Sequence, residues 1–561
     1  MKRDLIRLTQ KTYDVAIIGG GIYGACIAWD ATLRGLAVVL VEQGDFGGAT
    51  SANSQKIIHG GLRYLQHGAF RRMRESIRER HTLMHIAPHL VHPLQFLIPT
   101  YGYGLRSKAV LAIAMLLNDL ISCDRNRHGD PQKYLPRGRV ISKKACLQLV
   151  PGLEEPRLTG GAVWFDGQVQ HAERLTLTFL LSAAEQGADV ANYAQVVDFL
   201  RQKDCIRGVK IRDELTHNCF EISSRLVVNT SGPWINHILS FLNQESLEHV
   251  HFVRAIVLVT RQLLSTTSFG IYGKSNYKDQ DVILDKGSRL FFITPWKDTS
   301  LIGTFHTKEN LNPNRQRMSQ EEIHHLLQEI NDIYPAASLK REDIYHVYQG
   351  LLPINGQDSN RGDVQIAKQY RIIDHAEKDH LEGLISVTGV KLTTARDVAE
   401  KVVNLIMKKL RCSPVTCRTA GTPLAGGHIE RFDDYLKKAI AHKPAEFDSE
   451  VITHLVYHYG TYYLKILDHI ANRPELGQRI SPDLSVIKAE IVYAVQEEMA
   501  IRLSDVICRR TALAYKGLPD EACLLTCAHY MAEEFGWNAT KIEQEIDMVR
   551  KSYSNMTEKF L

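Results

Sequence analysis

The chain has 561 residues, of which 44% are hydrophobic and 23% are charged. This is the composition of a folded globular protein, and it excludes a disordered or collagen-like chain. The 68 basic and 63 acidic side chains leave a net charge of +5, which is too mild to favour nucleic acid as a partner. At roughly 100–200 residues per domain, we expect three or four domains.

The cysteines and the apolar runs indicate the cellular compartment of the protein. Ten cysteines are scattered without a C-x-x-C pair, so we expect free thiols in a reducing cytoplasm and no metal site. The first seven residues have no apolar signal core, and the longest apolar run, 109–117, is far shorter than the ~20 residues that cross a bilayer. The sequence therefore predicts a cytoplasmic protein that does not span the membrane.

The first element in chain order carries a dinucleotide-binding pattern. A strand at 14–18 leads into Gly19-Gly-Gly21-Ile-Tyr-Gly24, and a helix at 25–33 and a strand at 37–41 follow. The three spaced glycines allow a tight turn, a close approach of the backbone to a pyrophosphate, and close helix–strand packing. Glu42 ends the second strand, where its carboxylate would accept hydrogen bonds from the adenosine ribose. This motif alone leaves NAD and FAD open.

The next segment is a loop rich in small and hydroxyl residues. It runs from Gln43 to Gly61 and contains Thr50-Ser51 and the run Ser54-x-Lys56-x-Ile58-His59-Gly60-Gly61-Leu62-Arg63-Tyr64-Leu65. This run closely resembles the FAD-dependent glycerol-3-phosphate dehydrogenases, within the D-amino-acid-oxidase-like flavoproteins. Similar segments follow at 226–234 and 384–396, and the resemblance extends to about residue 515. Three nucleotide-contacting segments in this order are typical of the flavin group.

The resemblance implies an α/β fold. A Rossmann-like FAD-binding domain would be joined to an antiparallel-sheet substrate domain and a C-terminal all-helical domain. We expect the FAD-binding domain at 1–90, 150–235 and 355–415, the substrate domain at 90–150 and 235–355, and the helical domain at 420–561. Alternating patterns such as 255–260 predict the strands, and helical periodicity alone follows the 421–427 linker.

The resemblance also implies a set of site residues. Those expected to bind FAD are Gly19, Gly21, Gly24, Glu42, Thr50, Ser51, Ser54, Lys56, His59, Gly61, Gly232, Gly389, Lys391, Leu392 and Thr393. Arg63 would grip an anionic group with two hydrogen bonds, and Lys391 would bind the substrate or stabilise negative charge on the reduced flavin. Both are candidate catalytic residues. Tyr64, Arg254 and Lys368 are the further candidates for substrate binding.

The implied reaction is hydride transfer from a secondary alcohol carbon to flavin N5, while a base removes the hydroxyl proton. Electrons would pass on to quinone or oxygen. Glycerol 3-phosphate is the first candidate substrate, and another small anionic hydroxy or amino compound is the alternative. A catalytically silent FAD-binding regulatory protein is a third hypothesis. The sequence leaves a monomer and a homodimer open.

Two polar groups of the family's substrate site are replaced. Where the family has Gly-Ser-His, this chain ends the same stretch with Val257, so the expected catalytic histidine is missing. The arginine that follows Tyr-x-Gly in the family is Leu352 here. His306 is the candidate for a relocated base, with a hydrogen-bonded structural role as its alternative. His59 is a second candidate, for which a role in the flavin loop is favoured.

An apolar stretch at 105–118 has two interpretations. With Arg106 and Lys108 at its start, it is either a core helix or a peripheral anchor on the inner face of the cell membrane. The anchor would work by attraction of the cations to the membrane surface and shallow insertion of an apolar face. Because the resembled family delivers electrons to membrane quinone, we keep both interpretations.

Overall fold

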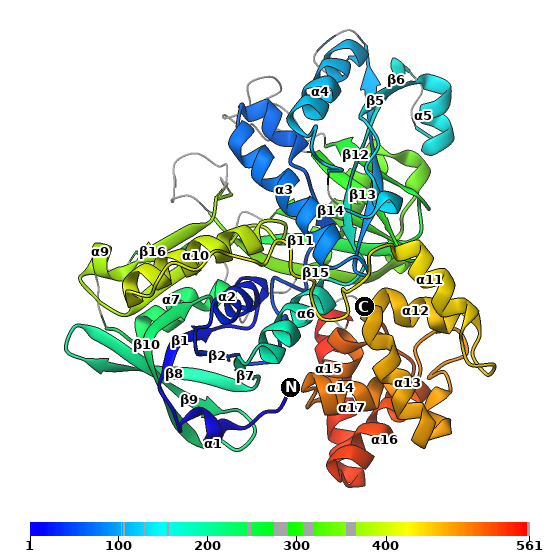
Figure 1. The fold of residues 1–561 in the computed structure, drawn as a ribbon. Helices are drawn as coiled ribbons and strands as arrows, with labels where there is room; N and C mark the ends of the chain where they lie inside the picture. The colour runs from blue at the N-terminus through cyan, green and yellow to red at the C-terminus, as the bar shows by residue number, and fades with distance from the viewer. Residues whose placement is uncertain are drawn as a thin grey trace.

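The computed structural model describes residues 1–102, 104, 107–127, 129–153, 156–243, 248–273, 290–306, 313, 318–354, 366–367 and 369–557. Two large sheets lie at the lower left and upper right of Figure 1, and the last third of the chain forms a group of helices beside them. The predicted combination of an α/β part and a C-terminal helical part is confirmed.

The first sheet contains the dinucleotide pattern. Its strand order is β16-β17-β10-β1-β2-β7, parallel except for β16. The strands are β1 (Tyr13–Ile18), β2 (Val38–Val41), β7 (Asp189–Ala191), β10 (Cys219–Asn229), β16 (Arg371–Asp374) and β17 (Leu384–Thr388), with β8 (Ala194–Gln202) and β9 (Cys205–Asp213) attached through β10. β2 is buried along its whole length, as expected for a parallel strand covered on both faces.

Three helices lie side by side against this sheet (Figure 1). They are α2 (Ile22–Leu33), α6 (Ala172–Glu185) and α10 (Ala395–Leu410). Almost every residue of α2 is buried, because the helix is covered by α6 on one side and by α10 on the other. This packing brings the turn before α2 and the turn before α10 to the same edge of the sheet.

The second sheet has the order β15-β11-β14-β13-β12-β4-β6-β3, with β5 on β6. It is antiparallel except for the parallel pair of β12 and β4. The strands are β3 (Ile57–Ile58), β4 (Val91–Tyr101), β5 (Arg139–Ser142), β6 (Leu158–Val169), β11 (Phe252–Arg261), β12 (Thr267–Tyr272), β13 (Leu290–Trp296), β14 (Thr299–His306) and β15 (Ile344–Pro353).

Further helices surround this sheet and join it to the first. They are α3 (Phe70–Ile86), α4 (Lys108–Ile121), α5 (Lys143–Leu149) and α8 (Gln320–Ile333). Three short helices lie near the first sheet instead: α1 (Leu5–Leu8), α7 (Ile235–Ser240) and α9 (His375–Asp379). β6, which the sequence assigned to the FAD-binding domain, pairs with β4 along most of its length. The exact domain limits remain a prediction.

The C-terminal part is built on two apolar clusters of its own. Its helices are α11 (Phe432–Ala441), α12 (Ser449–Tyr459), α13 (Tyr463–Asn472), α14 (Ala489–Glu498), α15 (Leu503–Asp505), α16 (Glu521–Phe535) and α17 (Ala539–Thr557), with a π-helix at Val506–Arg510. We call residues 420–557 the helical domain. It packs beside the first sheet, and the π-helix contacts α6.

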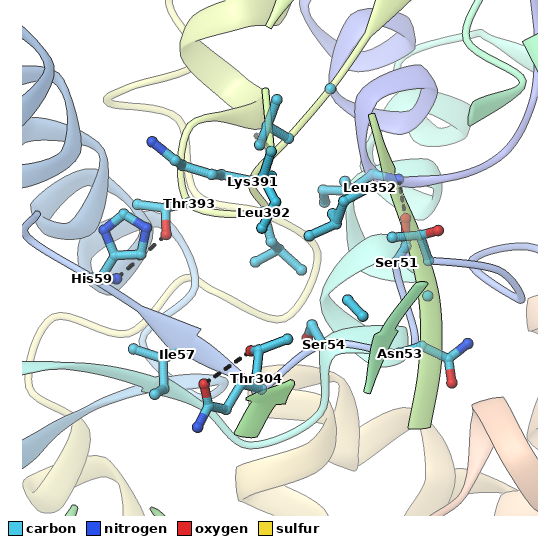
Figure 2. A pocket seen from close by; sticks show the side chains of 18 of the residues that line it. Ser51, Asn53, Ser54, Ile57, His59, Thr304, Leu352, Lys391, Leu392 and Thr393 are labelled. Carbon is cyan, nitrogen blue, oxygen red and sulfur yellow. Dashed lines mark hydrogen bonds between the residues drawn. The ribbon is translucent and has the colours of Figure 1, made fainter. Parts of the chain in front are cut away.

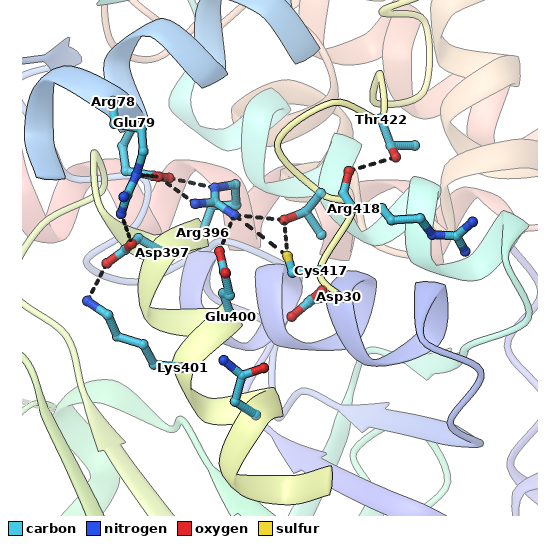
Figure 3. A network of polar contacts seen from close by, with 12 residues as sticks. Asp30, Arg78, Glu79, Arg396, Asp397, Glu400, Lys401, Cys417, Arg418 and Thr422 are labelled. Carbon is cyan, nitrogen blue, oxygen red and sulfur yellow. Dashed lines mark hydrogen bonds and ion pairs between the residues drawn. The ribbon is translucent and has the colours of Figure 1, made fainter. Parts of the chain in front are cut away.

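A buried ion pair fixes α3 against α10 (Figure 3). The carboxylate of Glu79 accepts two hydrogen bonds from the Arg396 guanidinium, at 2.7 Å from Nε and 2.5 Å from Nη2. Arg396 Nη1 also donates to Thr419 Oγ1 at 2.9 Å and to Glu400 Oε2 at 3.0 Å. Because Arg396 is the second residue of α10, these bonds set the position of the turn that precedes this helix.

Two substitutions compare how much the buried and the exposed carboxylate partners of Arg396 contribute to stability. The side chain of Glu79 has no exposed surface, whereas that of Glu400 is 37% exposed. Glu79→Ala leaves a buried guanidinium without its carboxylate, so we expect a loss of about 3–5 kcal/mol in the free energy of unfolding. Glu400→Ala should lose at most about 1 kcal/mol. Chemical denaturation measures both, and equal losses would contradict this account of the pair.

Candidate active site

A cavity of about 1010 Å³ lies where the two sheets meet. It is bordered by the carboxyl ends of β1, β2, β10 and β17, by the loop from Glu42 to His67, and by residues of β11 and β15. Ligands of open parallel sheets bind at this edge. The volume is at the upper end of the ~300–1,000 Å³ that small-molecule sites span, which suits a dinucleotide together with a small substrate.

The turn between β1 and α2 has no room for side chains. A Cβ on Gly19, whose φ is +105°, would lie 2.7 Å from the carbonyl oxygen of Thr230, and one on Gly24 would lie 2.0 Å from that of Gly19. Gly21 borders the cavity and precedes α2 without a side-chain cap. Apart from that of Ile22, which donates to Ser51 Oγ, the first-turn amides of α2 are therefore available to an anion such as a pyrophosphate.

The Glu42 carboxylate lies beside this glycine turn. Its Oε2 accepts a hydrogen bond from the Gly20 amide at 2.7 Å, and its Oε1 accepts one from the Gly44 amide at 2.9 Å. Burial raises the pKa of Glu42 above its usual value. The carboxylate is thus fixed beside the glycine turn and lines the cavity, where a ribose role remains a prediction.

The flavin loop, residues 43–61, brings hydroxyl groups to the cavity. Ser51 Oγ accepts a hydrogen bond from the Ile22 amide at 3.0 Å, at the first residue of α2. Thr50 Oγ1 accepts from the Leu351 amide and donates to the Leu351 carbonyl, both at 3.2 Å. Ser54 lines the same cavity (Figure 2). The loop therefore joins α2 to β15, as a wrap around a bound group requires.

Lys56 lines the cavity, but its ammonium is paired within the protein. Its ammonium lies 3.0 Å from Glu173 Oε1 and donates to the Ala52 carbonyl at 3.2 Å, and the residue is 1% exposed. The cation also lies 4.6 Å from the centre of the Tyr348 ring. Because a buried ammonium is stabilised only by such partners, Lys56 anchors the flavin loop instead of presenting its charge to a cofactor.

The turn between β17 and α10 forms the opposite wall. A Cβ on Gly389 would lie 1.9 Å from the Tyr23 ring, so that Tyr23 occupies the space of any side chain there. The Tyr23 hydroxyl donates to the Lys391 carbonyl at 2.9 Å and accepts from the Val390 amide at 3.1 Å. These contacts hold Lys391, Leu392 and Thr393 along one side of the cavity (Figure 2).

His59 lies beside this turn (Figure 2). Its amide donates to Thr393 Oγ1 at 3.3 Å, and its ring Nδ1 is buried without a hydrogen-bond partner. Burial, and then the nearby cations of Lys391 and Arg80, lower the pKa of His59 to about 3. The imidazole is therefore neutral at physiological pH. Gly61 follows with φ +79°, and the Tyr64 ring lies where its Cβ would be.

The expected cations are present at this end of the cavity. Arg63 is exposed at its border, and Tyr64 and Lys391 line it. The Lys391 ammonium lies 4.3 Å from the centre of the Tyr64 ring, which is within cation–π range. Burial lowers the pKa of Lys391 to about 8. The structure therefore brings Arg63 and Lys391, two of the cations that the sequence suggested, to the same cavity.

The two replaced positions both line the cavity. Val257 on β11 and Leu352 on β15 face it together with Ala255. In the pairing of the two strands, Val253 is opposite Leu352 and Val257 is opposite Tyr348. This part of the wall is apolar, where the resemblance implies a histidine and an arginine.

The positions of Arg254 and His306 differ from those that the sequence predicted. Since neighbouring residues of a strand face opposite sides, Arg254 points away from the cavity that Ala255 and Val257 line, and its buried guanidinium pairs with Glu322. His306 pairs with Ala255 at the end of β14 and does not line the cavity, although Thr304 does. Arg254 was expected to bind the substrate and His306 to act as the base, and neither side chain lines the cavity. Lys368 lies outside the described residues.

The sequence missed some of the lining residues. Gly232 was among the residues expected to bind FAD, and it borders the cavity with a φ of +56°. Arg72 also lines it and donates two hydrogen bonds to the Gln369 side-chain oxygen, at 2.8 and 2.7 Å. Arg509 reaches it from the helical domain. Residue 509 falls within the stretch to about 515 over which the resemblance extends, but nothing in the sequence indicated that this side chain would reach the cavity.

Comparisons with known proteins agree with this geometry. The family model "FAD dependent oxidoreductase" matches residues 14–401, and "C-terminal domain of alpha-glycerophosphate oxidase" matches residues 417–542. A glycerol-3-phosphate dehydrogenase of Synechocystis sp. is 36% identical over 91% of this chain and 91% of its own length. One of Mycobacterium leprae is 31% identical over 96% of this chain and 88% of its own length.

A solved structure shows the same fold over nearly the whole chain. The glycerol-3-phosphate dehydrogenase from Bacillus halodurans complexed with FAD has a TM-score of 0.76 and 23% identity, and the match covers 99% of this chain and 97% of that one. The mitochondrial glycerol-3-phosphate dehydrogenase of Homo sapiens is 28% identical over 96% of this chain and 73% of its own length.

The pKa of Lys391 gives the site a testable pH dependence. With a pKa lowered to about 8, the ammonium is charged below that pH and loses its proton above it. We expect the affinity for a small anionic ligand to be constant below about pH 7 and to fall above pH 8. Lys391→Arg should move this fall to higher pH, because a guanidinium keeps its proton. Perturbation of flavin absorbance on ligand binding measures the affinity, and an unchanged profile in the variant would contradict the assignment.

Proposed function

Because the chain belongs to the family of FAD-dependent oxidoreductases that includes the glycerol-3-phosphate dehydrogenases, we propose that it oxidises the secondary hydroxyl of glycerol 3-phosphate or of a related small anionic compound. The observation that carries this proposal is one cavity with a glycine cradle at one end and Arg63 with Lys391 at the other. It is an FAD-dependent enzyme that acts on CH–OH donors.

The residues present fit FAD. The uncapped amides of α2 would hold the pyrophosphate, Glu42 the ribose, and Thr50, Ser51 and the turn at 389–393 the flavin. FAD, when bound, supplies the acceptor for the hydride. The chain itself has to hold the substrate with its alcohol carbon towards the flavin, and Arg63 and Lys391 are the cations that would hold its anionic end.

The proton of the hydroxyl has to pass to a base. Among the described lining residues, we assign this role to His59, whose Nδ1 is buried, so that Nε2 is the ring nitrogen left for a ligand. A ring whose pKa is lowered to about 3 is a weak proton acceptor. Loss of an effective base lowers a rate by about 10²–10⁴-fold, so we expect slow turnover.

The apolar wall affects the choice of substrate. A charge-assisted hydrogen bond to a phosphate contributes about 1.5–3 kcal/mol, or roughly 10- to 150-fold in binding. Leu352 removes one such bond where the family has arginine. The site therefore favours a substrate with less charge or more apolar surface at this end, while Arg63 and Lys391 hold one anionic group.

The proposed function also includes an electron acceptor and a contact with the membrane surface. Within the part of the chain that the structure describes, every helix is too short or too polar to cross a membrane. α4, however, exposes 60% of Ile113, 61% of Leu116 and 62% of Leu120. We propose that this face rests on the membrane surface and that quinone, or else oxygen, accepts the electrons. Arg106 lies outside the described residues.

A substrate panel tests the proposed activity. Holoenzyme mixed anaerobically with hydroxy and amino acids, glycerol 3-phosphate and its uncharged analogues should lose its oxidised flavin absorbance with at least one small anionic alcohol. A flavin that stays oxidised with every compound would contradict the proposal and favour the regulatory alternative.

Leu352→Arg tests the role of the apolar wall. The new guanidinium should bind the phosphate and improve the apparent affinity for glycerol 3-phosphate at least about tenfold, measured as the concentration dependence of anaerobic flavin reduction. Leu352→Met is the matched control, because it keeps an apolar side chain of similar size, and it should bind as the wild type does. An equal affinity in the arginine variant would contradict this account.

Two aspartate substitutions test whether the exposed face of α4 binds the membrane. Leu116→Asp with Leu120→Asp should abolish flotation of the protein with anionic liposomes, because charged groups oppose insertion of the face. Leu464→Asp with Leu525→Asp is the control, since these leucines are 51% and 47% exposed on the helical domain. If the α4 variant floats as well as the control, α4 is not the anchor.

A further inference from the structure

One side chain of the helical domain reaches the cofactor cavity. Arg509 lies in the π-helix Val506–Arg510, 464 residues along the chain from its partner Asp45. It lines the cavity beside Glu42 and Gly44, at the adenosine end, and its Cδ lies 4.0 Å from where Gly48 would carry a Cβ. Single π-helical turns are frequently found at functional sites.

Arg509 and its neighbour saturate the carboxylate of Asp45. Arg509 Nε donates to Oδ2 at 2.5 Å, and Arg510 donates to both oxygens at 2.7 Å. Asn192 Nδ2 adds a fourth hydrogen bond to Oδ1 at 3.1 Å. The Asp45 side chain is 1% exposed, and the two guanidinium groups hold the pKa of Asp45 well below its usual range.

A second carboxylate orients Arg509. Asp505 Oδ1 accepts from Arg509 Nη2 at 2.7 Å and from the Tyr193 hydroxyl at 2.6 Å, and its Oδ2 accepts the amides of Ile501 and Arg502, both at 2.9 Å. The buried cluster thus contains two cations and two anions. Because the charges balance and are hydrogen-bonded, the cluster has a well-defined geometry.

The cluster is continuous with the cradle for the dinucleotide. Asp45 follows Glu42 by three residues, and the amide of Gly47 donates to the Gly20 carbonyl at 3.0 Å. Phe46 packs so closely that a Cβ on Gly20 would lie 2.7 Å from its ring. A displacement of Asp45 would therefore move both the start of the flavin loop and the glycine turn. The far end of the loop is anchored separately, by Lys56 on Glu173.

We propose that the helical domain retains FAD, with Arg509 as the residue that positions the cofactor cradle. Arg509, together with Arg510, holds Asp45 and so keeps the loop at 43–51 closed against the glycine turn. The cofactor leaves when this contact opens. Arg509 acts through Asp45 and is a positioning residue, and no step of the substrate's oxidation is assigned to it.

The rate of FAD release from the full-length holoenzyme tests this proposal without any substrate. After dilution, the appearance of free FAD fluorescence gives the rate. Arg509→Ala and Asp45→Asn should each release FAD at least about tenfold faster, the change expected from loss of one charge-assisted hydrogen bond. Arg509→Lys should release FAD at a rate close to that of the wild type, since the lysine keeps a cation beside Asp45 and Asp505. Arg509 makes only one hydrogen bond to each of these carboxylates, so no bidentate pair is lost.

Arg550→Ala is the matched control in the same domain. Arg550 forms surface ion pairs with Glu521 and Asp547 and does not line the cavity, so its loss should leave FAD release unchanged. Release within twofold of the wild type for both Arg509→Ala and Asp45→Asn would overturn the proposal. Equal acceleration in Arg550→Ala would also overturn it, because it would show general loosening of the helical domain. Neither result depends on which substrate the enzyme oxidises.

Discussion

The close approach of β1, α2 and β10 is the constraint on which the rest of the site depends. The Thr230 hydroxyl donates to the Ile18 carbonyl at 2.8 Å, and no side chain fits at Gly19 or Gly24. The start of α2 is thereby held at the carboxyl edge of the sheet with its amides towards the cavity. Two further walls of the cavity are positioned relative to this turn. The flavin loop is held through the Ser51 hydroxyl at the start of α2, and the turn at 389–393 is held through Tyr23 against Gly389.

Buried charges fix the segments that come from distant parts of the chain. Lys56 with Glu173, Glu79 with Arg396, and Asp45 with Arg509 each join two elements that are far apart in sequence. Such pairs add little net stability, because burial removes water from both partners, but loss of one partner is costly. Their effect is to specify position. The polar wall of the cavity is therefore held in place by buried ion pairs, whereas the wall at Val257 and Leu352 is apolar.

Local patterns predicted the parts of the site that are local in sequence. The glycine turn, Glu42, the hydroxyl residues of the flavin loop and the turn at 389–393 all line the cavity as expected. The directions of Lys56, Arg254 and Arg509 were not predictable, because each depends on a partner in a remote segment, respectively Glu173, Glu322 and Asp45. Charge alone does not show whether a lysine or arginine meets a ligand or a buried carboxylate.

The central claim is that this cavity oxidises a secondary alcohol with a weak base and an incomplete phosphate site. The most direct test is the rate of anaerobic flavin reduction by glycerol 3-phosphate that carries deuterium on its secondary carbon, compared with the ordinary compound. Because cleavage of the carbon–hydrogen bond would limit the rate, the account predicts slow bleaching of the flavin that deuterium slows severalfold further. Bleaching at the same rate with both compounds would contradict it.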